Sequence, residues 1–209
     1  MLKKEYEILE IFAQKPWKKC AYREIKEYIH KNSKSYVFGI LKKFVKQRIL
    51  KEEKAGNVVL YSLDTSSEKA LIYAGIVSEH RAWNKKSLPY DDITRLMEKM
   101  PTEFFVLLIT GSYASGKQRK KSDLDMVIIC DNAFETKKIY AELQHYADTS
   151  IPPIHLYAFT EKEFALMLNN NEANYGKEIA KNCLIISGGR IYFKIMSEAI
   201  KNGFNGQEI

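Results

Sequence analysis

Two apolar segments constrain the fold of this chain more than any other feature. Residues 104–110 read Phe-Phe-Val-Leu-Leu-Ile-Thr, and residues 124–130 form a second apolar run, which is continuous from Met126 onward. Uninterrupted runs of this length are typical of strands buried on both faces, because a solvated face would show alternating polar residues. Residues 154–159 predict a third strand, and the apolar spacing over residues 135–147 predicts an amphipathic helix.

Helices are expected before and after these strands. Asp91 and Asp92 indicate the start of one helix, and further helices are expected from Thr160 to the end of the chain. This alternation indicates an α/β or α+β domain. We assign an α+β domain with a small mixed sheet flanked by helices to residues 90–203. A helical linker is expected over residues 66–89.

The N-terminal residues show a different pattern. Apolar residues at helical spacing predict three short helices. The third of these carries Val37, Ile40, Leu41, Phe44 and Val45. Residues 58–63 are rich in β-formers, and Ala55-Gly56-Asn57 predicts the turn of a hairpin before them. Three helices and a hairpin resemble a winged helix-turn-helix, so we expect such a domain over residues 1–65.

The net charge of +7 lies entirely in this N-terminal region. Residues 1–65 contain fifteen Lys and Arg against eight Asp and Glu, whereas residues 66–209 contain eighteen of each. In a winged helix the third helix enters the major groove of DNA. Lysine neutralises phosphate but reads bases less well than arginine, so this composition favours affinity over specificity. The predicted DNA-binding residues are Lys34, Ser35, Tyr36, Lys42, Lys43, Lys46, Lys51 and Lys54. The alternative is a lysine-rich surface on a winged helix that docks a protein.

The composition argues against several classes of protein. The longest apolar run is far shorter than the ~20 residues that a membrane helix needs. Residues 1–7 mix charges and do not resemble a signal peptide. Cys20, Cys130 and Cys183 follow no paired spacing and predict reduced thiols. We therefore expect a cytoplasmic protein that does not bind a membrane.

A glycine turn and an aspartate pair connect the first two predicted strands. Gly111-Ser112 follows the first strand, and Asp123 and Asp125 lie at the start of the second. Residues two apart in a strand project to the same face, so the two carboxylates converge. Such a pair is costly beside a buried strand unless a cation lies between them. Magnesium prefers carboxylate and phosphate oxygens, and Ser112 can offer its hydroxyl and N–H to a phosphate.

This pattern predicts a nucleotide site with a basic loop. The predicted nucleotide-binding residues are Gly111, Ser112, Ser115, Gly116, Lys117 and Arg119. The chain has no G-x-x-x-x-G-K-[ST] motif, so the glycine loop is not a P-loop. Gly-Ser, ten residues and then Asp-x-Asp resembles the signature of the DNA polymerase β-type nucleotidyltransferase superfamily, and in particular its minimal nucleotidyltransferase group.

The resemblance covers about residues 90–200 and implies a reaction. A nucleotidyl group, most plausibly AMP from ATP, would pass to a hydroxyl of a protein or small molecule, and pyrophosphate would leave. The resemblance also implies that Asp123 and Asp125 bind two Mg²⁺ ions, which stabilise the entering and leaving oxygens. Minimal nucleotidyltransferases often act as antitoxins that modify a HEPN-type toxin, so the resemblance implies such a partner as an acceptor.

The sequence departs from the family pattern at the third carboxylate. The family places an acid in the next core strand, where this chain has His155. His155 could act as a general base, since the unperturbed pKa of histidine near 6.5 suits that task, although imidazole is a poor Mg²⁺ ligand. Asp148 or Glu161 could supply a displaced acid, or transfer could be weak or lost. A hydrogen-bonding role for His155 within the sheet is the structural alternative. We assign Asp123, Asp125 and His155 as the candidate catalytic residues.

Two functions follow from these observations. The leading expectation is a Mg²⁺-dependent nucleotidyltransferase fused to a DNA-binding winged helix. The competing expectation is a non-catalytic transcriptional regulator or antitoxin whose degenerate domain senses a nucleotide. Since winged helices usually read DNA as dimers, we expect a homodimer.

Overall fold

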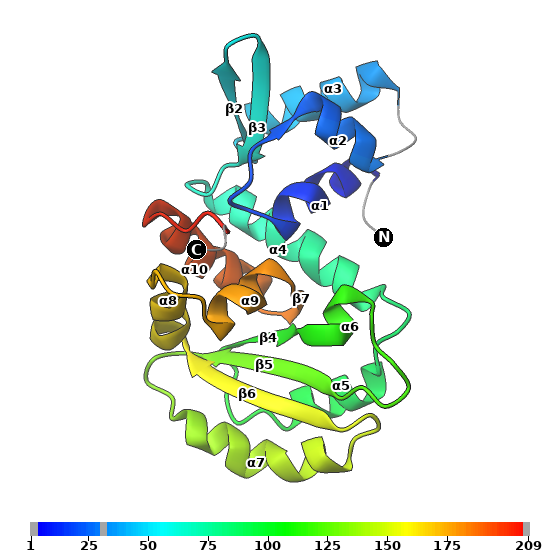
Figure 1. Cartoon of the computed structure of the whole chain (residues 1–209), viewed down its shortest axis with the longest axis vertical. Coiled ribbons are helices and arrows are strands. Elements are labelled where there is room, and N and C mark those ends of the chain that lie inside the picture. Colours follow the sequence, from blue (N-terminus) through cyan, green and yellow to red (C-terminus); the bar gives the residue numbers. More distant parts are fainter. Residues whose placement is uncertain (1–3, 30–32, 207–209) are drawn as a thin grey trace. The chain divides into compact units, whose positions relative to one another are not determined.

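The computed structural model describes residues 4–29 and 33–206. The chain divides into two compact units, whose elements are labelled in Figure 1. Unit 1 contains the described residues up to His80 together with residues 189–206, and unit 2 contains residues 81–188. No helix in the described part of the chain is long and apolar enough to span a membrane.

Unit 1 begins with short helices and a small sheet. A 3₁₀ turn, η1 (Lys4–Tyr6), is followed by α1 (Glu7–Gln14), β1 (Cys20–Ala21), α2 (Tyr22–Ile29), α3 (Lys34–Lys46), β2 (Leu50–Ala55) and β3 (Val58–Leu63). The hairpin β2–β3 pairs antiparallel from Leu50 opposite Leu63 to Ala55 opposite Val58. The turn at its tip contains Gly56 with φ +58°, a left-handed conformation that glycine adopts without strain. The short strand β1, which we did not predict, pairs with the other edge of β3.

The helices of unit 1 bury most of the apolar positions that the spacing predicted, although Val45 is only half-buried. The buried side chains include Ile8, Leu9 and Phe12 of α1, Ile25 of α2, and Val37, Ile40, Leu41 and Phe44 of α3. Ser33 caps α3, because its hydroxyl accepts from the Tyr36 N–H at 3.3 Å. Exposed residues alternate with these positions, so α3 has one buried face and one solvated face.

Asp64 is a buried carboxylate directly after β3. It accepts from the Ser66 hydroxyl at 2.6 Å, the Ser66 N–H at 3.2 Å and the Lys51 ammonium at 3.0 Å. Burial alone would raise the pKa of Asp64, but the hydrogen bonds from Ser66 and Lys51 outweigh burial and lower it. The carboxylate therefore links β2 to the segment that leads into the next helix.

Two long helices complete unit 1. From the sequence, we assigned the first to a linker and the second to the second domain. These are α4 (Glu68–Trp83) and α10 (Gly189–Lys201), and the described part of α4 up to His80 lies in unit 1 with α10. A Cβ on Gly75 would lie 2.8 Å from the Arg190 nitrogen, so the two backbones approach too closely for any side chain there. Glu79 accepts from the Gly189 N–H at 2.7 Å, and Arg190 pairs with Glu68. The expected bounds of 66–89 for a linker and 90–203 for the second domain therefore differ from the observed units.

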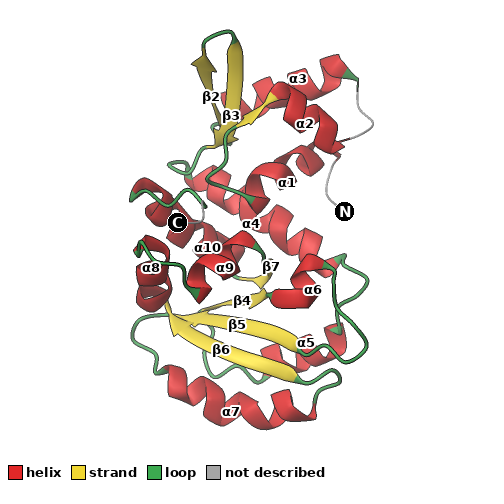
Figure 2. Ribbon diagram, in the orientation of Figure 1, coloured by secondary structure: helices red, strands yellow, loops and turns green. Residues whose placement is uncertain are grey.

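Unit 2 is built on a four-stranded mixed sheet. Its elements are α5 (Tyr90–Glu98), β4 (Phe105–Ile109), α6 (Gly111–Ser115), β5 (Leu124–Cys130), α7 (Thr136–Thr149), β6 (Ile154–Thr160), α8 (Glu161–Asn169), α9 (Tyr175–Lys181) and β7 (Leu184–Ser187). The strand order is β6-β5-β4-β7, with β5 parallel to β6 and β4 antiparallel to both of its neighbours. The prediction of helices alone after Thr160 was wrong, because β7 adds an edge strand (Figure 2).

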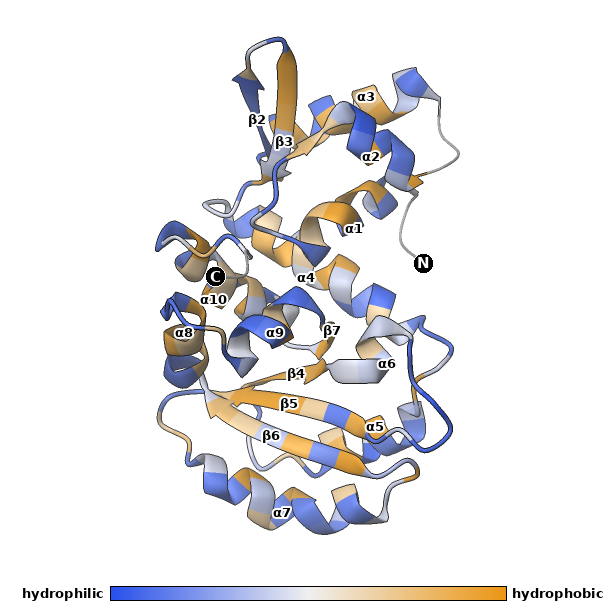
Figure 3. Ribbon diagram, in the orientation of Figure 1, coloured by the Kyte–Doolittle hydropathy of each residue, from blue (hydrophilic) through white to orange (hydrophobic). Residues whose placement is uncertain are grey.

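Both faces of the sheet are covered, which explains the uninterrupted apolar runs. One face packs Leu107, Met126 and Ile128 against Ile93 of α5 and Leu143 of α7. The opposite face carries Tyr157 and Phe159, whose rings lie 4.8 Å and 6.4 Å from the ring of Tyr175 on α9. In Figure 3 strand β5 is mostly hydrophobic, with one hydrophilic band near its start. Asp125 is the polar residue near the start of β5, and the candidate site lies there.

Replacing Asp64 with Asn should destabilise unit 1 by about 1–3 kcal/mol, because Lys51 loses its charged partner and the amide accepts fewer hydrogen bonds. Since the pKa of Asp64 is lowered, its stabilisation is present above about pH 4 and is lost as the pH falls through the folded-state pKa. The measurement is urea unfolding followed by Trp17 fluorescence in a Trp83→Phe background.

The matched control is Glu27→Gln, which removes an exposed i,i+4 ion pair with Arg23. This control should change the free energy of unfolding by less than about 0.5 kcal/mol. An Asp64→Asn midpoint equal to that of the control at pH 7 would contradict the role given to this carboxylate.

Candidate functional site

The turn between β4 and α6 brings the glycine motif against the aspartate pair. The Thr110 N–H donates to the Asp125 carbonyl at 2.9 Å, and Gly111 follows with φ +63°. A Cβ on Gly111 would overlap the Oδ2 atom of Asp125. Position 111 therefore requires glycine for two reasons: the backbone is left-handed there, and the Asp125 carboxylate occupies the space that a Cβ would need.

The structure brings the three candidate catalytic residues together. Asp125 lies opposite His155 in the parallel pairing of β5 and β6. The His155 Nδ1 atom is 3.7 Å from Asp125 Oδ1, and its Nε2 atom is 3.5 Å from Asp123 Oδ2. The side chains of His155, Asp123 and Asp125 are 58%, 40% and 28% exposed, so a substrate can reach them.

The donor atoms at this position fit magnesium better than a softer metal. Within the described residues, no group of three or more His, Cys, Asp or Glu side chains is placed to hold a metal ion. Magnesium is usually bound by one or two carboxylates, with water and phosphate oxygens as the remaining ligands. Asp123 and Asp125 supply such a pair. The imidazole of His155 is a poor ligand for this ion, so we do not count His155 among the magnesium ligands.

Neither displaced acid lies beside the aspartate pair in a way that would complete the site. Glu161 begins α8 at the far end of β6, six residues beyond His155, which corresponds to about 20 Å of strand. Asp148 is exposed on α7, where its Oδ1 accepts from Gln144 at 2.8 Å. Of the residues proposed for the third position, His155 is the one that lies within 4 Å of both Asp123 and Asp125.

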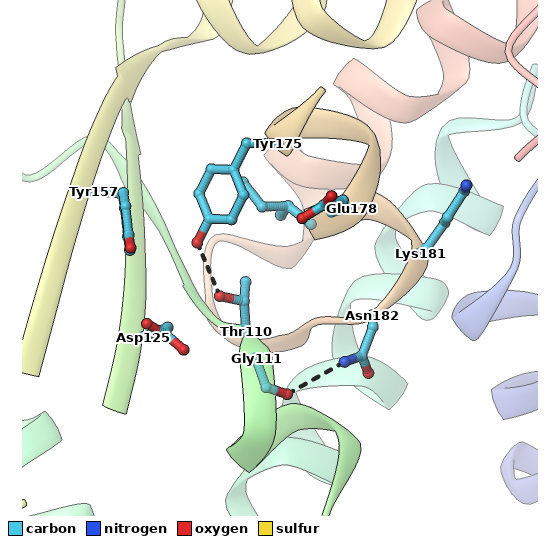
Figure 4. Close-up of a pocket in the computed structure, with 9 residues that line it drawn as sticks. Thr110, Gly111, Asp125, Tyr157, Tyr175, Glu178, Lys181 and Asn182 are labelled. Carbon is cyan, nitrogen blue, oxygen red and sulfur yellow. Dashed lines mark hydrogen bonds between the residues drawn. The ribbon is translucent and has the colours of Figure 1, made fainter. Parts of the chain in front are cut away.

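A pocket of about 420 Å³ opens beside Asp125 and Gly111 (Figure 4). It is lined by Thr110, Gly111, Asp125, Tyr157, Tyr175, Glu178, Ile179, Lys181 and Asn182. Seven of these nine residues were not predicted: Thr110 at the end of β4, and six residues from β6, α9 and the position after α9. The sequence of α9, Tyr-Gly-Lys-Glu-Ile-Ala-Lys, contains no motif, and only the packing of this helix over the sheet brings it to the site.

Helix α9 and the residue that follows it hold the glycine turn at two points. The hydroxyls of Tyr175 and Thr110 are 3.2 Å apart, and the Asn182 side-chain amide donates to the Gly111 carbonyl at 3.4 Å. Burial raises the pKa of Tyr175 to about 12, the hydrogen bond with Thr110 opposes this rise, and Tyr157, Asp125 and Glu178 add to it. Tyr175 therefore stays neutral at physiological pH.

The other predicted nucleotide-binding residues lie on α6 and the loop after it. The Ser115 hydroxyl donates to the carbonyls of Gly111 and Ser112, both at 3.1 Å, so it stabilises α6 internally. Gly116 ends α6 with φ +72°. Lys117 and Arg119 are exposed, and of the six predicted residues only Gly111 lines the pocket.

A further contact to α6 was missed because it comes from the segment before α5. The Lys85 ammonium donates to the Ala114 carbonyl at 2.8 Å. Burial, together with the nearby Arg81, lowers the pKa of Lys85. Lys85 thus supports the C-terminal half of α6.

The predicted DNA-binding lysines fall into two groups in unit 1. Ion pairs neutralise Lys42 with Glu52 at 2.7 Å, Lys43 with Glu5 at 2.8 Å and Lys51 with Asp64 at 3.0 Å. Lys34, Lys46 and Lys54 are exposed and lie outside the ion pairs found among residues 4–29 and 33–206. Ser35 and Tyr36 are exposed in the first turn of α3. Three of the six predicted DNA-binding lysines are therefore paired with acids of the same unit, and the other three are available to a polyanion.

Of three comparisons with known proteins, one gave a match, and it covers part of the chain. Neither the search of curated proteins nor the search of solved structures gave a match. Residues 98–186 match the family model described as the nucleotidyltransferase domain, and this segment contains the glycine turn, both aspartates and His155. The match lies wholly within unit 2 and supports the assignment of this segment to the nucleotidyltransferase superfamily.

Proposed function

We propose that unit 2 transfers a nucleotidyl group, AMP from ATP, to a hydroxyl of a protein or small-molecule acceptor in the presence of Mg²⁺. The family match supports nucleotidyl transfer in general. The observation that carries the proposal is the convergence of Asp123, Asp125 and His155 beside the Gly111 turn.

Asp123 and Asp125 would hold Mg²⁺, which when bound would neutralise charge on the phosphates. Gly111 leaves room for the Asp125 carboxylate, and the hydrogen bonds from Tyr175 and Asn182 keep the turn in place. The Ser112 N–H and hydroxyl would contact a phosphate oxygen. The turn and the aspartates would thus orient the same phosphate group from two sides.

His155 would act as the general base that takes the proton of the acceptor hydroxyl. Its ring nitrogens lie within 4 Å of both aspartates, so the ring would be within reach of an acceptor hydroxyl that approaches the phosphate held there. The pocket lined by Tyr157 and Tyr175 would hold the nucleoside, since aromatic rings offer a stacking surface for a base.

Asp123→Asn and Asp125→Asn should each lower transfer by at least about 100-fold, and His155→Ala should lower it by about 100-fold or more. The measurement is pyrophosphate release and label transfer from α-³²P-ATP with Mg²⁺. His145→Ala, on the exposed side of α7, is the matched control and should keep wild-type activity.

Two results would contradict this assignment. Wild-type protein that binds the nucleotide but releases no pyrophosphate would favour the non-catalytic regulator. A His155→Asp variant far more active than the wild type would show that the histidine marks a degenerate site.

Gly111→Ala should lower transfer by at least about 100-fold, because a Cβ there displaces the Asp125 carboxylate. Gly116→Ala is the matched control: its φ of +72° imposes similar backbone strain, but its Cβ would meet only Lys85 Nζ, at 4.0 Å. The comparison of kcat for the two variants separates the collision from the strain. Equal losses would show that strain alone accounts for the effect.

A second function is favoured by unit 1. We propose that its helices and hairpin form a winged helix-turn-helix that binds DNA as a dimer. The observation in its favour is α3, whose sequence Lys-Ser-Tyr-Val-Phe-Gly-Ile-Leu-Lys-Lys-Phe-Val-Lys contains four lysines and no acidic residue. The hairpin adds Lys54 near its tip.

Replacing Lys34, Lys46 and Lys54 with Ala should weaken binding to duplex DNA and lower the slope of log K against log salt by about one per lysine. Lys43→Ala should have a smaller effect, because Glu5 already neutralises this side chain. Fluorescence anisotropy over a salt series measures both. Equal effects of all four single variants would contradict the distinction drawn from the ion pairs.

A further inference from the structure

An aromatic side chain stands among the lysines on the exposed face of α3. Phe38 is 50% exposed, whereas Val37, Ile40, Leu41 and Phe44 of the same helix are buried. Residues at positions 35, 38, 42 and 46 lie along one side of a helix, so Phe38 lies in the middle of the solvated stripe. The fold of unit 1 does not use this ring as part of its core.

The ring has a cation beside it and open space next to it. Lys42 Nζ lies 5.6 Å from the Phe38 ring centroid and also pairs with Glu52 on β2. A Cβ on the neighbouring Gly39 would meet nothing within 4 Å. A glycine in a helix interior costs about 1 kcal/mol relative to alanine, and nothing in the packing around Gly39 requires it. The missing side chain lets a partner approach the helix closely beside Phe38.

The charge around Phe38 indicates what would cover it. All four charged residues of α3 are lysines. On the hairpin, the exposed residues Lys54 and Val59 lie opposite each other. They are two residues along the strands from Glu52 and Tyr61, which also lie opposite each other and are next to Lys42. Alternation along the strands places Lys54 and Val59 on the same side of the hairpin as that pair. The surroundings favour a polyanion that also presents an apolar group.

Duplex DNA meets both requirements. Its phosphates attract the lysines, and the major groove exposes the C5 methyl group of thymine, which phenylalanine can contact. Lysines do not distinguish one base sequence from another as well as bidentate side chains do. We propose that Phe38 reads a thymine by packing against its C5 methyl group, and that it is a specificity-determining residue of unit 1. This inference rests on the proposed DNA binding.

The test uses the full-length chain and a duplex selected from a random pool by the wild-type protein. Each thymine is replaced in turn by deoxyuridine, which removes only the methyl group. At one position in each half-site, wild-type affinity should fall about fourfold, the value of one buried methyl group. Phe38→Ala should bind the thymine and uracil duplexes equally, and Phe38→Leu should keep part of the discrimination. Val58→Ala is the matched control, since this exposed valine lies on the other side of the hairpin, and it should discriminate as the wild type does.

The outcomes separate this inference from the function on which it rests. If the wild type binds no duplex, the proposed DNA binding fails and this inference fails with it. If the wild type binds DNA but tolerates uracil at every position, or if Phe38→Ala keeps the discrimination, only the role of Phe38 is overturned. Unchanged Trp17 fluorescence in Phe38→Ala, measured in a Trp83→Phe background, shows that the variant remains folded.

Discussion

The contact between Gly111 and Asp125 is the constraint on which the candidate active site depends. The end of β4 and the start of β5 are joined by the hydrogen bond from Thr110 to the Asp125 carbonyl, so the turn and the carboxylate must share one small volume. Only a residue without a side chain allows this. The parallel pairing with β6 then brings His155 to the same place. The site thus follows from strand pairing and one glycine.

Much of unit 2 could be predicted from the sequence because its information is local. The uninterrupted apolar runs over β4 and β5 indicated strands covered on both faces, and the two-residue spacing of Asp123 and Asp125 indicated converging carboxylates. The short run Leu184–Ser187 is also apolar and was overlooked as a strand. Four residues between two helices are a weak signal, since such a run suits a buried helix segment as well.

The pocket could not be predicted in the same way. Tyr175, Glu178 and Asn182 are about fifty residues from Asp125 in the sequence, and their polar character is typical of any exposed helix. Their role arises from the packing of α9 over β6, which the local pattern does not encode. The lysines of unit 1 show the opposite error: the sequence assigned six of them to the DNA-binding surface, whereas Glu52, Glu5 and Asp64 neutralise Lys42 and Lys43 of α3 and Lys51 of β2.

The domain bounds also show how tertiary packing overrides order along the chain. Unit 1 consists of the described residues up to His80 and of residues from Gly189 onward. Residues 81–188 are therefore inserted into it, and they contain the segment that matches the nucleotidyltransferase family model. The close approach of α4 to α10 depends on Gly75 and Gly189, which are too far apart in sequence to be recognised as partners. Five of the thirteen residues of α10 are apolar and buried side chains, Tyr192, Phe193, Ile195, Met196 and Ala199. A fragment cut at residue 65 or 89 would separate α10 from residues of its own unit and leave part of this apolar surface uncovered. Unit 1 is therefore discontinuous in sequence, and both of its segments are needed to bury the apolar side chains of α10.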